Sequence, residues 1–538
     1  MTKTKEIPQF DYKGIKKITI PCVDEDFSAS NGYGWSIIKR YLPTILTAHQ
    51  KNEEKITYLY NYFLGEQDIE FKKRKRDADK DNNNKEVENH AYRQVEFKVG
   101  FLCGEIRDYA HKSDSKSNDL KFLDRYFTDC KFFQKDANLK EWIYSVGLGV
   151  TETKPRVDII TTDIDVVTQK STSRYLTAAE GYNVEYESPF EFECVDPRNN
   201  FVVYSSASGE KPIFCVKYVD VDVATEKDDA PIIKKQLLVE TRYAYFKFLA
   251  ESNFGVFYWN TEKDVTSAPK SIRYLPLLEF SVNKDRIGIV EKNRSAFNTI
   301  NLFRSATNDM VIDNANSLLV FKNVDIDEET IQDMIKAGAV ILKDSATGAV
   351  ANVADLKNIT IEIPYDKMAV YVDQVTQNAY DIVGVPMASG QTTSGGDTGQ
   401  ARLLGGGWNN AYIVINKEKL FVQGTDYDQL KLFLMLCQQV PDSPIKNLYA
   451  SDIDINYRVN QNDNLQVKAQ SMKYMYDMNM PLEFILKAGG LSNDIKTDSA
   501  NWQANIDRAN ALAAQLEASK SASSAEDNST EEGLTQTE

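Results

Sequence analysis

Short apolar runs and apolar–polar alternation mark residues 155–280 as a β-rich part of the chain. Phe201 to Tyr204 form one such run, and a turn at Ser208-Gly209 separates it from the next, Ile213 to Val219. Tyr243 to Phe248 continue the same pattern. We therefore expect several neighbouring strands in this region.

Apolar residues recur at helical spacing in other parts of the chain. An irregular arm precedes a helix over Lys39 to Tyr62, in which Pro43 is expected in the first turn, where a proline is tolerated. A second, polar-rich helix is expected over roughly residues 293–315. Its apolar face would carry Phe297, Ile300, Phe303 and Met310.

A third helix, from Pro364, follows the period of 3.6 residues most closely. Gly384 and Pro386 are expected to end it. Its apolar positions are Met368, Tyr371, Val372, Val375, Ala379 and Ile382. A small α/β module lies between the second and third helices. Its expected elements are strand Leu318 to Phe321, helix Asp327 to Gly338, strand Val340 to Leu342, a turn at Ala346 to Gly348 and strand Ile359 to Ile363.

The chain from Met387 to Gly399 is rich in Gly, Ser and Thr, which predicts a mobile loop. Helix is expected to resume near Gln400 and to continue towards Val440, with a break at Gly405-Gly406-Gly407. A further helical pair covers about 464–516, with interruptions at Pro481 and Gly489-Gly490. The Ser- and Glu-rich end of the chain is expected to be disordered.

A length of 538 residues fits roughly two to four structural units. The net charge of −16 argues against a protein that clamps nucleic acid, because phosphate affinity comes mainly from clustered Lys and Arg. It is compatible with an acidic surface that repels the phosphates and lets DNA slide past, and equally with charge that only keeps the protein soluble. The basic run Lys72 to Arg76 could touch nucleic acid, but acids follow it and a solvated loop is the preferred interpretation.

Motifs of enzyme chemistry are missing from the sequence. There is no phosphate-binding loop, no dinucleotide-binding glycine motif, no H-E-x-x-H and no G-x-S-x-G. The three histidines, His49, His90 and His111, have no neighbouring nucleophile in the sequence. Asp163 and Asp165 share one strand face, but nothing beside them completes a metal site. We expect no enzymatic activity, no catalytic residue, no cofactor and no metal site.

The six cysteines are scattered without a C-x-x-C pair, which predicts buried free thiols in a reducing compartment. No apolar run approaches the roughly 20 residues that span a bilayer, so no membrane partner is expected. The first residues lack the apolar core of a secretory signal. We therefore expect a cytosolic product.

Several short segments follow one another in a characteristic order over roughly residues 55–510. They are Tyr62 to Ile69, Asn89-His90, Lys98 to Glu105, Asp196-Pro197, Phe201 to Ser205, Lys211 to Ile213, Leu275 to Phe280, Asn283, Arg286, Asn301, Ser305, Asn308-Asp309, Leu318 to Val320 and Thr398 to Ala401. In order and spacing they resemble the portal proteins of long-tailed double-stranded-DNA phages, particularly those that infect Gram-positive bacteria.

The resemblance implies an α+β protein with a portal fold, made of a mixed α/β wing, a two-helix stem, a small α/β clip and a helical crown. The implied divisions are an N-terminal arm (1–29), the wing (30–290), a stem helix (291–315), the clip (316–363), a second stem helix (364–385), a channel loop (386–400), the long wing helix with its return (401–460), crown helices (461–516) and a disordered acidic tail (517–538).

The same resemblance implies a ring, with twelve subunits, at one capsid vertex of the virion. As the head-to-tail connector, this ring would be the channel for DNA packaging and DNA ejection. The implied partners are other copies of the chain, double-stranded DNA, the terminase large subunit, the major capsid and scaffolding proteins and the head-completion adaptor. Assembly would take place in the cytoplasm of the host bacterium.

Three groups of residues are candidates for function. Stem packing is expected from Phe297, Ile300, Tyr371, Val375 and Ala379, because two amphipathic helices need neighbours to cover them. The clip would meet partners through Asp325, Asp327, Glu328 and Glu329, although these acids could serve only as helix caps. The DNA-channel loop would present Met387, Gln391, Thr392, Ser394 and Asp397, with Arg402 behind it as a DNA contact or a salt-bridge partner.

Other interpretations belong to different classes of protein. A different virion ring protein, such as an adaptor or tail component, would not readily contain a strand-rich wing with a helix–clip–helix arrangement. A nucleic-acid enzyme of the terminase type should carry a phosphate-binding loop, which is missing. A secreted or surface binding protein should begin with a signal peptide.

Overall fold

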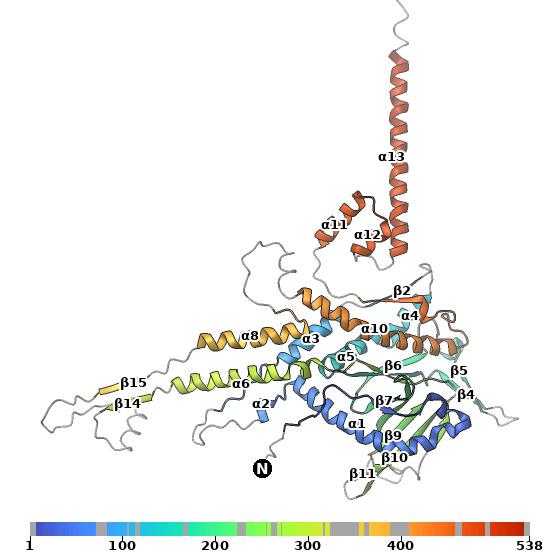
Figure 1. The fold of residues 1–538 in the computed structure, drawn as a ribbon. Helices are drawn as coiled ribbons and strands as arrows, with labels where there is room; N and C mark the ends of the chain where they lie inside the picture. The colour runs from blue at the N-terminus through green and yellow to red at the C-terminus, as the bar shows by residue number, and fades with distance from the viewer. Residues whose placement is uncertain are drawn as a thin grey trace, which may run out of the picture.

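The computed structural model describes residues 7–71, 83–104, 107–112, 119–164, 171–222, 233–253, 256–259, 266–270, 272–315, 318–322, 355–359, 365–387, 408–457, 465–489 and 495–531. Helices and strands are both abundant, and the expected α+β class is confirmed. Figure 1 shows a mixed body, two helices that project from it, and a separate group of helices towards the C-terminal end.

A seven-stranded sheet forms one half of the body in the order β1-β7-β8-β9-β10-β11, with β12 also paired to β10. The strands are β1 (Ile18–Ile20), β7 (Asn200–Ser205), β8 (Pro212–Asp222), β9 (Ile233–Thr241), β10 (Ala244–Asn253), β11 (Val256–Trp259) and β12 (Thr266–Pro269). The predicted runs 201–204, 213–219 and 243–248 lie mainly in β7, β8 and β10. Strand β1 was not expected; it pairs in parallel with β7, with Ile18 opposite Val203.

Helix α1 (Trp35–Leu64) packs against this sheet. Its apolar side chains Ile38, Leu42 and Ile45 join a core with sheet residues. The helix begins earlier than predicted, so Pro43 lies well inside it rather than in the first turn. A proline there cannot donate a hydrogen bond, but Pro43 and Lys39 are both on the exposed side, where water can bind the freed carbonyl group.

The other half of the body packs helices around a three-stranded sheet in the order β13-β3-β6. Five phenylalanines form its centre: Phe127, Phe132, Phe190, Phe192 and Phe433. The elements are α3 (His90–Cys103), α4 (Asp119–Asp129), α5 (Phe132–Ser145), β3 (Gly149–Pro155), β6 (Phe190–Val195), β13 (Leu277–Phe280) and α10 (Trp408–Gln439). Smaller elements are α2 (Asp68–Phe71), β2 (Asp108–His111), β4 (Ile160–Ile164), β5 (Ser171–Tyr175) and β16 (Ile453–Asn456).

The two projecting helices are α6 (Ile289–Ala315) and α8 (Tyr365–Val383), close to the predicted bounds. Strand β14 (Leu318–Lys322) follows α6 and pairs antiparallel with β15 (Asp355–Ile359). The last strand of the small module was predicted over 359–363; of these residues only Ile359 is described, and it ends β15. The rest of that module, 323–354 and 360–363, lies outside the described residues.

Three helices follow the body: α11 (Leu465–Asp477), α12 (Leu482–Gly489) and α13 (Ile495–Glu531). Pro481 separates the first two, as predicted, and Tyr476 stacks on Trp502 with ring centroids 5.7 Å apart. Helix α13 extends away from the body in Figure 1. The expectation of disorder from residue 517 is corrected over 517–531, where helix α13 continues and the segment contains no Pro or Gly to stop it.

Candidate functional site

The projecting helices α6 and α8, which we call the stem, lie side by side (Figure 1). Near the body, Asn293 donates a hydrogen bond from Nδ2 to the carbonyl oxygen of Ala379 at 2.6 Å. Farther out, the rings of Phe303 and Tyr371 lie 5.0 Å apart. The two helices are therefore in contact near the body and farther out along the stem.

A single subunit buries the predicted stem residues to different degrees. Phe297, Ile300 and Ala379 are fully buried, and Phe297 and Ala379 belong to the main apolar core. Val375 is half-buried, and Tyr371 remains 47% exposed. The inner part of the stem is thus anchored in the body, whereas its outer part keeps apolar surface available.

A polar stripe runs along α6. Asn301, Ser305 and Asp309 are fully buried although each is polar, and their spacing of four residues places them in one line on the helix. Met310, which was expected on the apolar face, is 37% exposed instead. The buried face of outer α6 is therefore polar, and it requires hydrogen-bond partners.

The partners come from residues 83–89, an extended segment that we call the strap. Every second backbone N–H of the strap donates to one side chain of the stripe. The bonds, each 2.9 Å, run from Asn84 to Asp309, from Glu86 to Ser305 and from Glu88 to Asn301. The spacing of the side chains along α6 matches the spacing of the N–H groups along the strap, because four helical residues advance by about 6 Å and two extended residues by about 6.6 Å.

The strap continues directly into helix α3, and the junction is also hydrogen-bonded. The Asn89 side chain accepts a bond from the Tyr92 N–H at 3.1 Å, which caps the start of α3. Gln67 donates to Asn89 at 3.0 Å and accepts from Asn301 at 2.5 Å. The stem, the strap and the first turn of α3 therefore form one connected polar network.

His90 links the strap to the second stem helix. Its Nε2 lies 3.0 Å from a carboxylate oxygen of Glu88, and its Nδ1 lies 3.0 Å from the Tyr380 hydroxyl on α8. The other oxygen of Glu88 pairs with Arg304 on α6 at 3.0 Å. These contacts connect α6 to α8 through the strap.

A buried ion pair anchors the start of the stem. Lys55 on α1 pairs with Glu291 on α6 at 2.8 Å, and it also donates to the carbonyl oxygens of Tyr12 and Gly14. Burial lowers the pKa of Lys55, and the nearby Glu291 carboxylate acts in the opposite direction. The N-terminal arm, α1 and α6 are held together at this point.

Two further buried ion pairs fix α10 to the body. Lys98 on α3 pairs with Glu418 at 3.0 Å, and burial lowers the pKa of Lys98. Arg107 lies between Asp136 on α5 and Asp426 on α10, at 2.5 Å from each. Buried pairs of this kind fix the relative orientation of helices, because either charge left alone would be costly.

The end of helix α8 lies against the first turns of α10. Gly384 adopts φ +64°, and a Cβ atom on it would lie 2.8 Å from the Val414 side chain, so glycine is required for this close approach. Asn410 donates to the carbonyl oxygen of Asp381 at 2.8 Å. The chain on either side of residues 388–407 is thus held at the base of the stem.

A family model described as "Phage portal protein, SPP1 Gp6-like" matches residues 43–402, two thirds of the chain. The match includes both stem helices and the paired strands β14 and β15. The chain belongs to this phage portal protein family. No curated protein matches it.

The family match decides between the interpretations that the sequence left open, in favour of a portal protein. It also identifies the chain as a member of a structural rather than an enzymatic family. In this portal protein, α6 and α8 closely match the ranges predicted for the two stem helices, and β14 and β15 lie within the range predicted for the clip. The roles of these elements as stem and clip stay predictions.

The expected partner and channel residues of the portal protein fall largely outside the described residues. Met387 is described and packs against the main core. The others, Gln391, Thr392, Ser394, Asp397 and Arg402 for the loop and Asp325, Asp327, Glu328 and Glu329 for the clip, lie in the segments that are not described. Their roles stay predictions.

The stripe on α6 and the strap were not among the predicted functional residues of the portal protein. The stripe could have been recognised from its spacing, since Asn301, Ser305 and Asp309 recur every four residues in a helix. The strap leaves no comparable sequence signal, because it contributes backbone N–H groups, which nearly every residue type possesses.

Cysteine chemistry is not favoured in this portal protein. All six cysteines are free thiols, and burial raises the pKa of Cys103, Cys130, Cys194 and Cys215 to about 12. These thiols are protonated near neutral pH and are therefore weak nucleophiles.

The described residues contain no group of three His, Cys, Asp or Glu arranged to hold a metal ion. None of the described helices is long and apolar enough to cross a membrane.

Proposed function

We propose that twelve copies of this chain form a closed ring at the portal vertex of a phage capsid, and that double-stranded DNA passes through its channel during packaging and ejection. The proposal rests on the apolar side chains that the outer stem exposes in a single subunit. Leu302 and Val311 on α6, and Val370 and Tyr371 on α8, are exposed in a single subunit. Neighbours in a closed heterologous ring would cover such surfaces.

The charge of the chain supports a channel through which DNA slides. The net charge is −16, and the loop from Met387 to Gly399 has no basic residue. Tight phosphate contacts normally require Lys, Arg or ordered donors, so a polar loop without them offers weak, exchangeable contacts. We assign no catalytic step to the chain itself.

The partners proposed for the ring follow from its position in the virion. The clip, at the far end of the stem, would bind the terminase large subunit during packaging and the head-completion adaptor afterwards. The acids Asp325, Asp327, Glu328 and Glu329 would supply part of that contact. The wing and crown would meet the major capsid and scaffolding proteins.

Negative-stain images of the purified protein test the proposal, with native mass spectrometry to count subunits. We expect rings with a central hole and a mass twelve times that of one chain. An ATPase assay on the same material should give no activity above the background. Monomers at all concentrations, or ring-free aggregates from correctly folded protein, would overturn the proposed function.

A further inference from the structure

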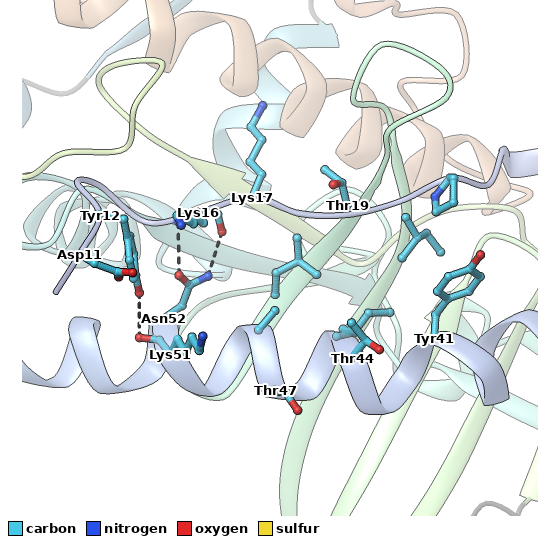
Figure 2. A pocket seen from close by; sticks show the side chains of 15 residues that line it. Asp11, Tyr12, Lys16, Lys17, Thr19, Tyr41, Thr44, Thr47, Lys51 and Asn52 are labelled. Atoms are coloured by element: carbon cyan, nitrogen blue, oxygen red, sulfur yellow. Dashed lines mark hydrogen bonds between the residues drawn. The ribbon is translucent and has the colours of Figure 1, made fainter.

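A groove of about 700 Å³ lies between the N-terminal arm and helix α1 (Figure 2). Its helix side is formed by the short, exposed residues Thr44, Thr47 and Ala48. Tyr12 and Tyr41 lie towards its two ends in Figure 2. Short side chains between two aromatic rings leave room for an extended backbone to approach the helix.

Strand β1 forms the other side of the groove, and it is an edge strand. Within the described part of the chain, its strand partner is β7, on one side only. The Ile20 carbonyl oxygen accepts a hydrogen bond from the Ser206 N–H at 2.9 Å, so the backbone groups of Ile18 and Ile20 face β7. Because alternate residues direct these groups to opposite edges, those of Thr19 face the open edge.

The groove is basic although the chain is acidic. Lys16, Lys17 and Lys51 line it, and among its described lining residues Asp11 is the sole acid. Lys17 pairs with Glu210 at 2.8 Å, but both side chains are well exposed, and such pairs contribute little. The groove therefore combines an open strand edge with positive charge, which fits an extended segment that carries carboxylates.

We propose that this groove binds an extended, acid-bearing segment of a neighbouring copy of the chain, which adds a strand to β1. A second copy is the occupant because the chain has a net charge of −16 and because a heterologous ring joins two different surfaces of one subunit. The inference rests on the proposed ring. Residues 11–21 precede the family match at 43–402, so the arm side of the groove is a feature of this chain beyond that match.

Photo-cross-linking of purified rings tests which segment occupies the groove. The change Ala48→p-benzoylphenylalanine places a reactive group on the helix side of the groove. We expect a covalent dimer in which mass spectrometry finds the Ala48 peptide joined to an acid-bearing segment of a second copy. Gln50→p-benzoylphenylalanine, on the same helix but outside the groove, should not reach that segment. Rings without an inter-subunit cross-link at Ala48 would overturn the inference.

Assembly measurements give an independent test. Thr19→Pro removes the backbone donor at the open edge, whereas Thr19→Val keeps it and serves as the control. If Thr19→Pro does not fold, the combined change Lys16→Glu, Lys17→Glu and Lys51→Glu tests the charge. The combined change Lys284→Glu, Lys417→Glu and Lys446→Glu, at exposed positions outside the groove, is the matched control. We expect about tenfold weaker ring formation for the groove variants and no change for the controls.

The two proposals fail in different ways. If the wild-type protein forms no ring, the proposed function is wrong, and the groove inference falls with it. If wild-type rings form normally but the triple charge reversal in the groove assembles as well as the triple reversal outside it, only the groove inference is wrong.

Discussion

Asn84 donates two hydrogen bonds to one carboxylate oxygen of Asp309, from its backbone N–H and from its side-chain amide, both at 2.9 Å. The two residues are 225 positions apart in the sequence. This contact is the outermost one between the strap and α6. The outer stem is therefore fastened to the body by hydrogen bonds, and its direction depends on polar groups as well as on apolar packing.

We expect Asn301→Ala to loosen the strap. The change removes the acceptor of the Glu88 N–H and the donor to Gln67, and a buried group left unpaired costs about 1–3 kcal/mol. Hydrogen–deuterium exchange should accelerate at the backbone N–H groups of residues 84–88. Ser295→Ala, on the exposed side of the same helix, is the control and should leave that exchange unchanged. Equal protection of the strap in both variants would contradict its assignment.

Val375→Asp should disrupt ring assembly. Val375 is half-buried in one subunit, so a neighbouring stem would complete its burial, and an unpaired charge there costs several kcal/mol. Light scattering should show rings lost or reduced. Gln377→Asp, at an exposed position of α8, is the matched control, and circular dichroism should show both variants folded. Rings of Val375→Asp that are indistinguishable from wild type would show that the stem does not pack between subunits.

A double-mutant cycle should reveal the role of the Lys98–Glu418 pair. Lys98→Met alone leaves the buried Glu418 carboxylate without its cation, which is expected to cost about 3–5 kcal/mol. Adding Glu418→Leu should recover most of this loss, because the second change removes the unpaired charge. Thermal unfolding of the single and double variants measures the difference. A double variant less stable than Lys98→Met would contradict this account.

Lowering the pH below about 6.5 should lower the free energy of unfolding, because of His49. Burial lowers the pKa of His49 from its ordinary value of 6.5, against the opposing effects of the Arg198 carbonyl and the Glu279 charge. As the pH falls through 6.5, the unfolded chain binds the proton first, so stability decreases by up to about 1.4 kcal/mol per pH unit until the lowered pKa is reached.

His49→Gln provides the comparison, since an amide can still bond to the Arg198 carbonyl but does not titrate. Denaturation measured between pH 7.5 and 5.5 should show a shallower pH dependence in this variant. Identical slopes for the two proteins would mean that His49 does not contribute.

Removal of Thr392 to Gly396 should separate assembly from DNA passage. These residues lie outside the described part of the chain, in the segment between α8 and α10 that composition predicts to be a mobile loop. We expect normal rings from the deleted protein, but impaired DNA packaging or retention in phage that carry the deletion. Phage that fill and keep their genomes normally would show that the segment is only a linker.

The sequence by itself determined the elements whose signals are local. The second stem helix was predicted from the 3.6-residue period after Pro364, and its end from Gly384 and Pro386, because an amphipathic face and its stop residues lie within one segment. Strands β7 and β8 were likewise predicted from apolar runs around the turn at Ser208-Gly209. The order of segments also indicated the family that the match then confirmed.

Where local signals were incomplete, the predictions shifted or failed. Pro43 suggested a later start for α1, because a proline is usually tolerated only in the first turn of a helix. Inside α1 it is tolerated because the carbonyl group of Lys39, which loses its hydrogen-bond donor, lies on the exposed side. The end of the chain suggested disorder by composition, although nothing in residues 517–531 stops the preceding helix.

Only the tertiary structure decided which distant groups meet. The three-residue strand β1 has too little pattern of its own, and it exists through pairing with β7, far along the chain. The partners of Asn301, Ser305 and Asp309 are backbone N–H groups of the strap, and such groups carry no residue-specific signal. Periodicity predicts which side of a helix is distinct, but the chain segment that covers it is settled by packing across the whole subunit.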